Sequence, residues 1–240
     1  MKRTLLSLIL ALFAVVGINA RTFVLITGIT DYPGKVNDLR FSTKDAKEFK
    51  SLMSKQTNDI VLLTSSNVTK PKVLDYYKKM CNAAKRGDRI IFYFSGHGVT
   101  NGMALYDVIM PYADLIALAA QSEASEKVFY LDTCLSGSIL DAVKGYDWSK
   151  SKRGKNDLII FASSRPDENS RENKYTGQSL FTQALLKGLR GKADTDGNKK
   201  IDVTELFKYI YQDVMSHSDN KIHPQLIAPQ ELQQSVLYVW

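Results

Sequence analysis

The 240-residue sequence contains little cysteine, with only Cys81 and Cys134. Two cysteines allow at most one disulfide, which excludes a small domain held together by several bridges. Cys81 lies in a segment with helical spacing of apolar residues, 70–86, whereas Cys134 directly follows a strand-like run. Because this placement makes a Cys81–Cys134 disulfide a poor geometric fit, we expect Cys134 to be a free, reactive thiol.

A long hydrophobic run is also missing. The apolar stretch Leu5–Gly17 is shorter than the about 20 residues that a membrane-spanning helix needs. Lys2 and Arg3 precede it, and the small-residue end at Ala20 resembles a cleavage site, which is the order of parts in a secretory signal peptide. No cysteine stands there to take a lipid, so we expect residues 1–20 to be removed and the protein to be exported, periplasmic or extracellular, without a membrane anchor.

Strong charge bias, internal repeats and low-complexity tracts are absent as well. The formal charge of +7 falls to +5 once a signal peptide carrying two cations is removed. No basic stripe interleaved with aromatic residues is present, so we expect no nucleic-acid partner. The remaining 220 residues, 21–240, are enough for a single domain with a substantial core.

Strand-like runs alternate with helical patterns along residues 21–240, which predicts an α/β sheet with helices packed on it. The runs are Thr22–Ile29, Asp59–Thr64, Arg89–Phe94, Lys127–Leu131, Asp157–Ala162 and Ser235–Trp240. The helical patterns are Ser42–Lys55, Lys70–Arg86, Asp114–Ser125, Gly177–Leu189 and Val203–Met215. We expect 235–240 to be the last strand and an edge that is able to pair, which leaves the oligomeric state open.

Two glycine-flanked polar motifs end the third and fourth runs: SGHG at 95–98 and DTCLSG at 132–137. The carboxyl ends of neighbouring parallel strands lie at one edge of a sheet, where α/β proteins place their chemistry. His97 and Cys134, 37 positions apart, are therefore expected to meet. A nucleophilic thiol beside an imidazole suits acyl transfer at a peptide carbonyl. The alternative is a buried structural cysteine and an unrelated loop histidine.

The chain resembles caspase-type cysteine peptidases of the metacaspase-like bacterial kind. The resemblance rests on VLITGITDYP, the Lys44-Asp45-Ala46 helix opening, YFSGHG, DTCLSG, FASSRPDE and GQSLFTQALLKGLRG, and it covers essentially all of 21–240. DTCLSG differs from the metacaspase pattern Asp-x-Cys-His-Ser-Gly by Leu135 in place of histidine, and the caspase pattern Gln-Ala-Cys-x-Gly is not matched. The resemblance implies a caspase-like three-layer α/β sandwich on a mainly parallel six-stranded sheet.

The resemblance also implies a cysteine endopeptidase that acts on proteins or peptides and requires no cofactor. Cys134 would attack the scissile carbonyl, and His97 would protonate the leaving amine and then assist the hydrolytic water. The backbone N–H groups of Gly98 and Cys134 would form the oxyanion hole. The sequence names no third residue that orients His97. The alternative is a catalytically silent caspase-like scaffold that binds a peptide or a partner protein.

In metacaspase-like relatives, acids in the specificity pocket select arginine or lysine before the cleaved bond. The matching positions here are Asp45, Ser95 and Asp132, and a carboxylate pair suits a planar guanidinium. Asp45 has a second reading as an ordinary first-turn acid that complements the helix dipole.

Residues 144–156 lack apolar periodicity and contain four clustered basic residues, Lys150, Lys152, Arg153 and Lys155. We expect an exposed loop between the fourth and fifth strand-like runs. By resemblance, this is the position of self-cleavage sites, so the loop is a candidate for maturation by cutting after Lys152, Arg153 or Lys155. The alternative is plain solvated surface, the usual meaning of a charge run.

Residues 194–205 carry oxygen-bearing side chains at positions 1, 3, 5, 9 and 12 of an EF-hand loop. These are Asp194, Asp196, Asn198, Asp202 and Glu205. They predict a candidate Ca²⁺ site. Two features count against it: Lys199 stands at the sixth position, where the loop needs glycine, and the loop has no paired partner. The alternative is a polar turn that leads into a helix beginning near Asp202.

Overall fold

The computed structural model describes residues 20–170, 172–173 and 177–240. The predicted signal peptide lies, apart from Ala20, outside the described residues. Within the described part of the chain, no helix has both the length and the apolarity needed to cross a bilayer.

A six-stranded sheet forms the centre of the fold, in the order β12-β8-β7-β3-β1-β2. Its strands are β1 (Thr22–Gly28), β2 (Ile60–Thr64), β3 (Arg89–Ser95), β7 (Glu126–Asp132), β8 (Leu158–Ala162) and β12 (Gln225–Ile227). The first five run parallel to one another, and β12 runs antiparallel to β8. The inner strands are apolar on both sides, as expected for a parallel sheet covered by helices.

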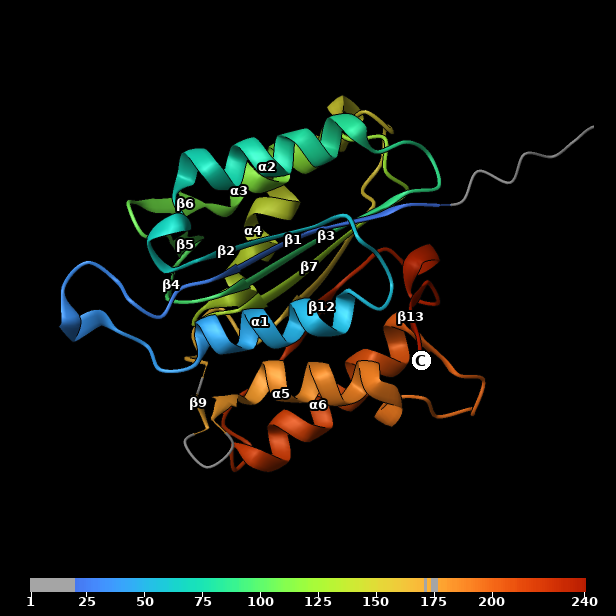
Figure 1. Ribbon diagram of the computed structural model, residues 1–240. Coiled ribbons are helices and arrows are strands. Elements are labelled where there is room, and N and C mark those ends of the chain that lie inside the picture. Colours follow the sequence, from blue (N-terminus) through green and yellow to red (C-terminus); the bar gives the residue numbers. More distant parts are fainter. Residues whose placement is uncertain (1–19, 171, 174–176) are drawn as a thin grey trace, which may run out of the picture.

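Helices cover both faces of the sheet, so the fold has three layers. They are α1 (Ser42–Met53), α2 (Lys70–Ala83), α3 (Tyr112–Ala120), α4 (Ile139–Gly145), α5 (Leu180–Lys187) and α6 (Val203–His217). Figure 1 shows α2, α3 and α4 on one face and α1, α5 and α6 on the other. This arrangement confirms the predicted three-layer α/β sandwich.

Successive side chains of each strand point to opposite faces of the sheet, so the hydrophobic core has two halves, one on each face. On the face under α2, Phe92 of β3 and Phe129 of β7 make edge contacts with Tyr77. On the other face, Tyr93 stacks on Phe49 of α1, with the ring centroids 4.6 Å apart. Because each strand contributes to both cores, the strands are near-continuous apolar runs, and this made them recognisable in the sequence.

Short elements surround the sheet. The small strands are β4 (Gly98–Val99), β5 (Gly102–Ala104), β6 (Ile109–Pro111), β9 (Glu172–Asn173), β10 (Gln178–Ser179), β11 (Lys200–Asp202) and β13 (Val236–Val239). The single helical turns are η1 (Lys35–Asn37), η2 (Ser65–Asn67), η3 (Ser136–Ser138), η4 (Trp148–Lys150), η5 (Gly188–Lys192) and η6 (Gln230–Leu232). Strands β4, β5 and β6 form a three-stranded sheet beside the carboxyl end of β3.

The prediction that 235–240 supplies the last strand of the central sheet was wrong. That place is taken by β12, whereas β13 pairs antiparallel with β11, with Ile201 opposite Tyr238. Strand β12 has three residues and directly follows Pro224, so it is too short to show a strand periodicity. The edges of the sheet are therefore β2 and β12.

Candidate active site

The register of the sheet brings the two sequence motifs together. Ser95, the last residue of β3, lies between Gly28 of β1 and Asp132 of β7. Because the strands are parallel and in this register, His97 and Cys134 each come two residues after the same edge of the sheet. In Figure 1 this edge lies at the end where β4 and β9 are labelled.

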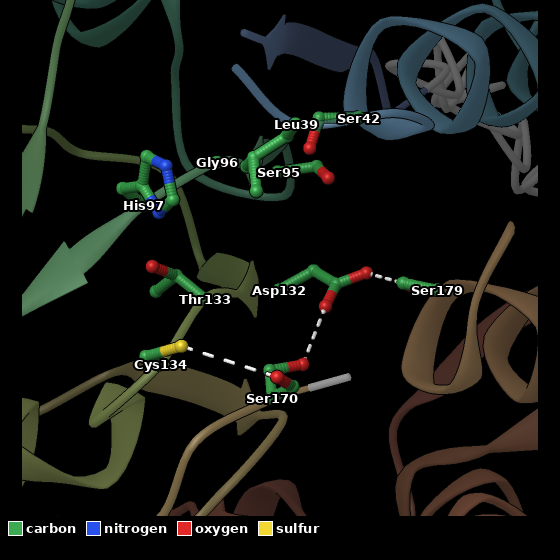
Figure 2. Close-up of a pocket in the computed structure, with 10 residues that line it drawn as sticks. All are labelled: Leu39, Ser42, Ser95, Gly96, His97, Asp132, Thr133, Cys134, Ser170 and Ser179. Atoms are coloured by element: carbon green, nitrogen blue, oxygen red, sulfur yellow. Dashed lines mark hydrogen bonds between the residues drawn. The ribbon is translucent and has the colours of Figure 1, made fainter. Parts of the chain in front are cut away.

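A cavity at this edge contains both predicted catalytic residues. Its walls are Leu39, Ser42, Ser95, Gly96, His97, Asp132, Thr133, Cys134, Ser170 and Ser179. Figure 2 shows His97 and Cys134 on the same side of the cavity, with Thr133 between them in this view and with Asp132 and Ser179 toward the other side. The expectation that the two motifs meet is confirmed; their catalytic roles stay a prediction.

The imidazole of His97 is held by a backbone carbonyl. Its Nε2 lies 2.7 Å from the carbonyl oxygen of Asn37, in the loop between β1 and α1. A carbonyl can only accept, so Nε2 carries the proton and Nδ1 is left to exchange a proton with Cys134. Sequence reasoning missed this contact because a backbone carbonyl is present at every position and leaves no residue-type signal.

Cys134 lies on a sharp turn after β7. Its thiol is half-buried and donates to the carbonyl of Ser170 at 3.9 Å. Burial raises the pKa of the Cys134 thiol above its ordinary value, and the negative charge of Asp132 acts in the same direction. Leu135 adopts a left-handed conformation with φ of 56°, and its N–H donates to the carbonyl of Glu168 at 2.8 Å. The thiol in this arrangement needs a base to become a nucleophile.

Gly98 contacts the turn that carries Cys134. A Cβ at this position would lie 2.2 Å from the Cys134 carbonyl oxygen and 2.3 Å from Thr133 Oγ1. Gly98 faces Met103 across the β4–β5 ladder, and the neighbouring bond runs from the Ala104 N–H to the His97 carbonyl. In this antiparallel pattern, the N–H of Gly98 points away from β5. The oxyanion-hole assignment of Gly98 and Cys134 stays a prediction that this orientation allows.

Asp132 is the acid that lines the cavity. Its Oδ2 accepts hydrogen bonds from the hydroxyls of Ser179 and Thr182, and its Oδ1 accepts from Ser170 Oγ at 3.1 Å. The residue is 4% exposed. Burial raises the pKa of Asp132 above its ordinary value despite these hydrogen bonds. Ser95 lies on the same wall.

Asp45 does not lie on the wall of the cavity, contrary to the expectation of a carboxylate pair that lines it. The residue is 1% exposed, and its Oδ2 accepts the backbone N–H of Ser179 at 3.1 Å. Ser179 therefore separates the two acids and contacts both, because its hydroxyl binds Asp132. Asp45 does stand in the first turn of α1, as its helix-dipole reading proposed, but its side chain also contacts β10.

Comparison with known proteins identifies the fold family. The family profile described as the caspase domain, Peptidase_C14, matches residues 21–233. The chain belongs to the caspase-domain family. A protein named "Probable protease" from a Desulfuromonadales bacterium is 26% identical to this caspase domain over 182 residues, 62% of the chain. The chain spans about a fifth of the length of that relative, of which 22% is covered.

Two solved structures share the fold of this caspase domain. Protein GSU0716 from Geobacter sulfurreducens superposes with a TM-score of 0.66 at 15% identity, over 89% of this chain and 97% of that one. Caspase-1 from Spodoptera frugiperda superposes with a TM-score of 0.67 at 17% identity, over 87% of this chain and 86% of that one. The chain is thus a peptidase-family protein with a caspase-like fold, as the sequence motifs predicted.

The basic loop 144–156 lies at the opposite edge of the sheet from the cavity. Its first two residues form the end of α4, Trp148–Lys150 form η4, and the rest leads into the amino end of β8, where the Lys152 N–H donates to the Ala120 carbonyl. Lys152 and Lys155 are exposed, as predicted. Arg153 is not: its side chain is 18% exposed, and its Nε lies 3.0 Å from Asp157 Oδ2. Sequence reasoning missed this pair because the run of cations gave no sign that one of them turns inward.

The predicted calcium-binding loop of the caspase domain holds three of its five candidate ligands close together. Carboxylate oxygens of Asp194, Asp196 and Glu205 lie within 4.8 Å of one another. Asp202 instead accepts the Glu205 N–H at 2.8 Å and forms a capping box at the start of α6, as the alternative reading proposed.

Asn198 in the same loop accepts the Lys200 N–H at 2.7 Å. Lys199 has a φ of 62°, the left-handed conformation that the sixth position requires. Calcium binding stays a prediction.

Both cysteines of the caspase domain are free thiols, as predicted. Cys81 is buried in α2, and burial raises its pKa to about 12. The Cys81 thiol is therefore protonated at neutral pH and serves as part of the core.

Proposed function

We propose that this caspase-domain protein is a cysteine endopeptidase that cleaves peptide bonds after arginine or lysine. The observation that carries the proposal is the cavity itself, which places a thiol, an oriented imidazole and a buried carboxylate at the ends of two adjacent strands. His97 and Cys134 lie on one side of the cavity, and Asp132 lies toward the other. That spacing suits a substrate whose carbonyl reaches Cys134 while its side chain extends toward Asp132.

Whether the Cys134 thiol is protonated before substrate binds determines how the first chemical step begins. Because burial raises the pKa of Cys134, the thiol is protonated at neutral pH, and Nδ1 of His97 takes the proton as Sγ attacks the carbonyl carbon. The backbone N–H groups of Gly98 and Cys134 stabilise the oxyanion that develops. Charge on the imidazolium is stabilised by the Asn37 carbonyl at Nε2.

The imidazolium then gives its proton to the leaving amine, so the C–N bond breaks and a thioester remains on Cys134. Water attacks the thioester carbonyl while Nδ1 of His97 accepts its proton. The C–S bond breaks, the substrate acid leaves, and the thiol is restored. The cycle requires no cofactor.

Specificity for a basic side chain rests on Asp132. A guanidinium or ammonium entering the cavity would exchange the Ser170 hydroxyl on Oδ1 for a charge-assisted hydrogen bond, which is the stronger kind. Asp45 would position Asp132 through Ser179, whose N–H binds Asp45 and whose hydroxyl binds Asp132, without touching the substrate. The self-processing of loop 144–156 and the export of residues 21–240 belong to the same proposal, with protein or peptide substrates and no nucleic-acid or membrane partner.

The test compares turnover of residues 21–240 on fluorogenic peptides that differ only in the residue before the cleaved bond: Arg, Lys, citrulline or Asp. We expect turnover after Arg and Lys, much slower turnover after citrulline, none after Asp, and the same ranking with and without Ca²⁺. Cys134→Ala should abolish turnover, whereas the matched control Cys81→Ala should keep it.

Turnover after Asp would keep the nucleophile but overturn the role of Asp132. A folded protein with no turnover on any peptide would instead support the silent scaffold.

A further inference from the structure

Tyr32 contacts both the backbone and the ring of His97, and neither the motifs nor the cavity lining assigns it a role. Its hydroxyl accepts the backbone N–H of His97 at 2.8 Å and donates to the carbonyl of Ala104 at 3.0 Å. Its ring lies against the imidazole, with the centroids 4.8 Å apart and the planes tilted by 45°. We propose that Tyr32 is a positioning residue for His97, an inference that rests on the proposed function.

Only a hydroxyl makes both of these hydrogen bonds. It accepts from one backbone group and donates to another, which a phenylalanine ring cannot do. Burial raises the pKa of Tyr32 well above its ordinary value, so the phenol keeps its proton at neutral pH. The Tyr32 hydroxyl therefore links His97, the residue before β4, to Ala104 of β5.

The first glycine of the SGHG motif makes room for this contact. A Cβ at Gly96 would lie 2.6 Å from the Tyr32 oxygen and 2.8 Å from the Phe94 ring. Any larger residue at this position would push the phenol away from the His97 N–H. The glycine is thus needed for the Tyr32 contact.

Tyr32 and Asn37 act on His97 from the same loop. The loop is closed by a bond from the Leu39 N–H to the Thr30 carbonyl at 2.9 Å, and the Tyr32 N–H donates to Asp38 Oδ1 at 3.0 Å. Tyr32 fixes the backbone of His97, and the Asn37 carbonyl fixes the far side of its ring. Two fixed points direct Nδ1 toward Cys134.

Tyr32 does not line the cavity, so its loss affects proton transfer and leaves substrate binding intact. We expect Tyr32→Phe to lower kcat by about 10- to 100-fold, because general acid–base catalysis depends on the placement of the proton donor, with KM changed less than about twofold. The matched control is Tyr238→Phe, which removes a buried hydroxyl that donates to the Leu52 carbonyl at 3.3 Å, away from the cavity. It should leave kcat and KM unchanged.

A second readout does not depend on turnover. The chain has three histidines, so ¹⁵N-histidine labelling gives three resolved imidazoles by NMR. We expect His97 of the native chain to be the Nε2–H tautomer, and Tyr32→Phe to give a mixture of tautomers. His217 and His223 should not change. Thermal melts of both Tyr variants show that the comparison is made on folded protein.

The outcomes separate the two proposals. A native chain without turnover, whose His97 tautomer nevertheless changes in Tyr32→Phe, would overturn the peptidase and keep the positioning role. An unchanged kcat with unchanged His97 signals would overturn the positioning role. An Nδ1–H tautomer in the native chain would overturn it without reference to any variant.

Discussion

At the scale of single residues, the most consequential side chain is Asp132, because it is buried and expected to bind a cation. Its oxygens accept hydrogen bonds from Ser170, Ser179 and Thr182. Burial nevertheless raises its pKa, so the carboxyl loses its charge at a higher pH than an ordinary aspartate does when the solution is acidified. The selectivity of the cavity should therefore depend on pH.

We predict that the preference for arginine over citrulline falls as the pH is lowered from neutral, at pH values above the ordinary aspartate pKa of 3.8. Citrulline has nearly the same shape but no charge, so the ratio of the two kcat/KM values cancels any pH effect on the chemical step that both substrates share. Asp132→Asn should remove the preference at every pH. A ratio that stays constant on acidification would contradict the charge-based selectivity.

The Gly98 contact yields a second prediction at this scale. Gly98→Ala would place a Cβ 2.2 Å from the Cys134 carbonyl oxygen, far inside van der Waals contact, so the turn that carries the thiol must move. We expect a loss of kcat of about 100-fold or more and a lower Tm. Gly145→Ala is the control, because nothing lies within 4 Å of a Cβ there. Equal effects of the two substitutions on kcat and Tm would show that the site accepts a Cβ at Gly98, which would contradict the prediction.

At the scale of elements, a buried ion pair joins the amino ends of β7 and β8. Lys127 Nζ lies 2.5 Å from Asp157 Oδ2, with side chains 1% and 2% exposed, and Arg153 binds the same oxygen. Burial lowers the pKa of Lys127 and raises that of Asp157, each toward its neutral form. Such a pair adds little net stability compared with apolar residues, but the loss of one partner leaves the other charge uncompensated.

We predict that Asp157→Ala lowers the free energy of unfolding by about 3–5 kcal/mol, measured by urea denaturation. The control is Asp147→Ala, whose partner Lys150 is 78% exposed and whose loss should leave the free energy of unfolding nearly unchanged. The double variant Lys127→Met, Asp157→Leu should recover most of the loss. A loss below about 1 kcal/mol for Asp157→Ala would mean that water reaches Lys127.

The elements also show what the sequence could predict. The five parallel strands were recognisable because each is an apolar run of five to seven residues, and their ends predicted where Cys134 and His97 meet. Strand β12 was missed because its three residues form a strand only through pairing with β8. Asn37, Tyr32 and the inward turn of Arg153 were missed for the same physical reason: each depends on a contact made by tertiary structure, which no local pattern records.

At the scale of the whole molecule, the sheet separates the candidate processing loop from the cavity. Strand β7 runs from Glu126, near the loop, to Asp132, in the cavity, which is about 20 Å at 3.3 Å per residue. In Figure 1, the segment coloured as residues near 150 lies at the far end of the sheet from β4 and β9. Cys134 of one folded molecule therefore cannot reach loop 144–156 of the same molecule.

We predict that any processing of this loop occurs between molecules, after Lys152 or Lys155, because Arg153 is held by Asp157. A tagged Cys134→Ala chain should be cut when active chain is added, at a rate proportional to the active-chain concentration. Lys152→Gln with Lys155→Gln should block the cut, whereas Lys150→Gln should not. If the active chain is cut at a rate independent of its concentration while the Cys134→Ala chain stays intact, the loop must leave its place at the amino end of β8 and reach its own thiol. That result would mean that the Arg153–Asp157 pair opens in the native protein, which Asp157→Ala would then accelerate.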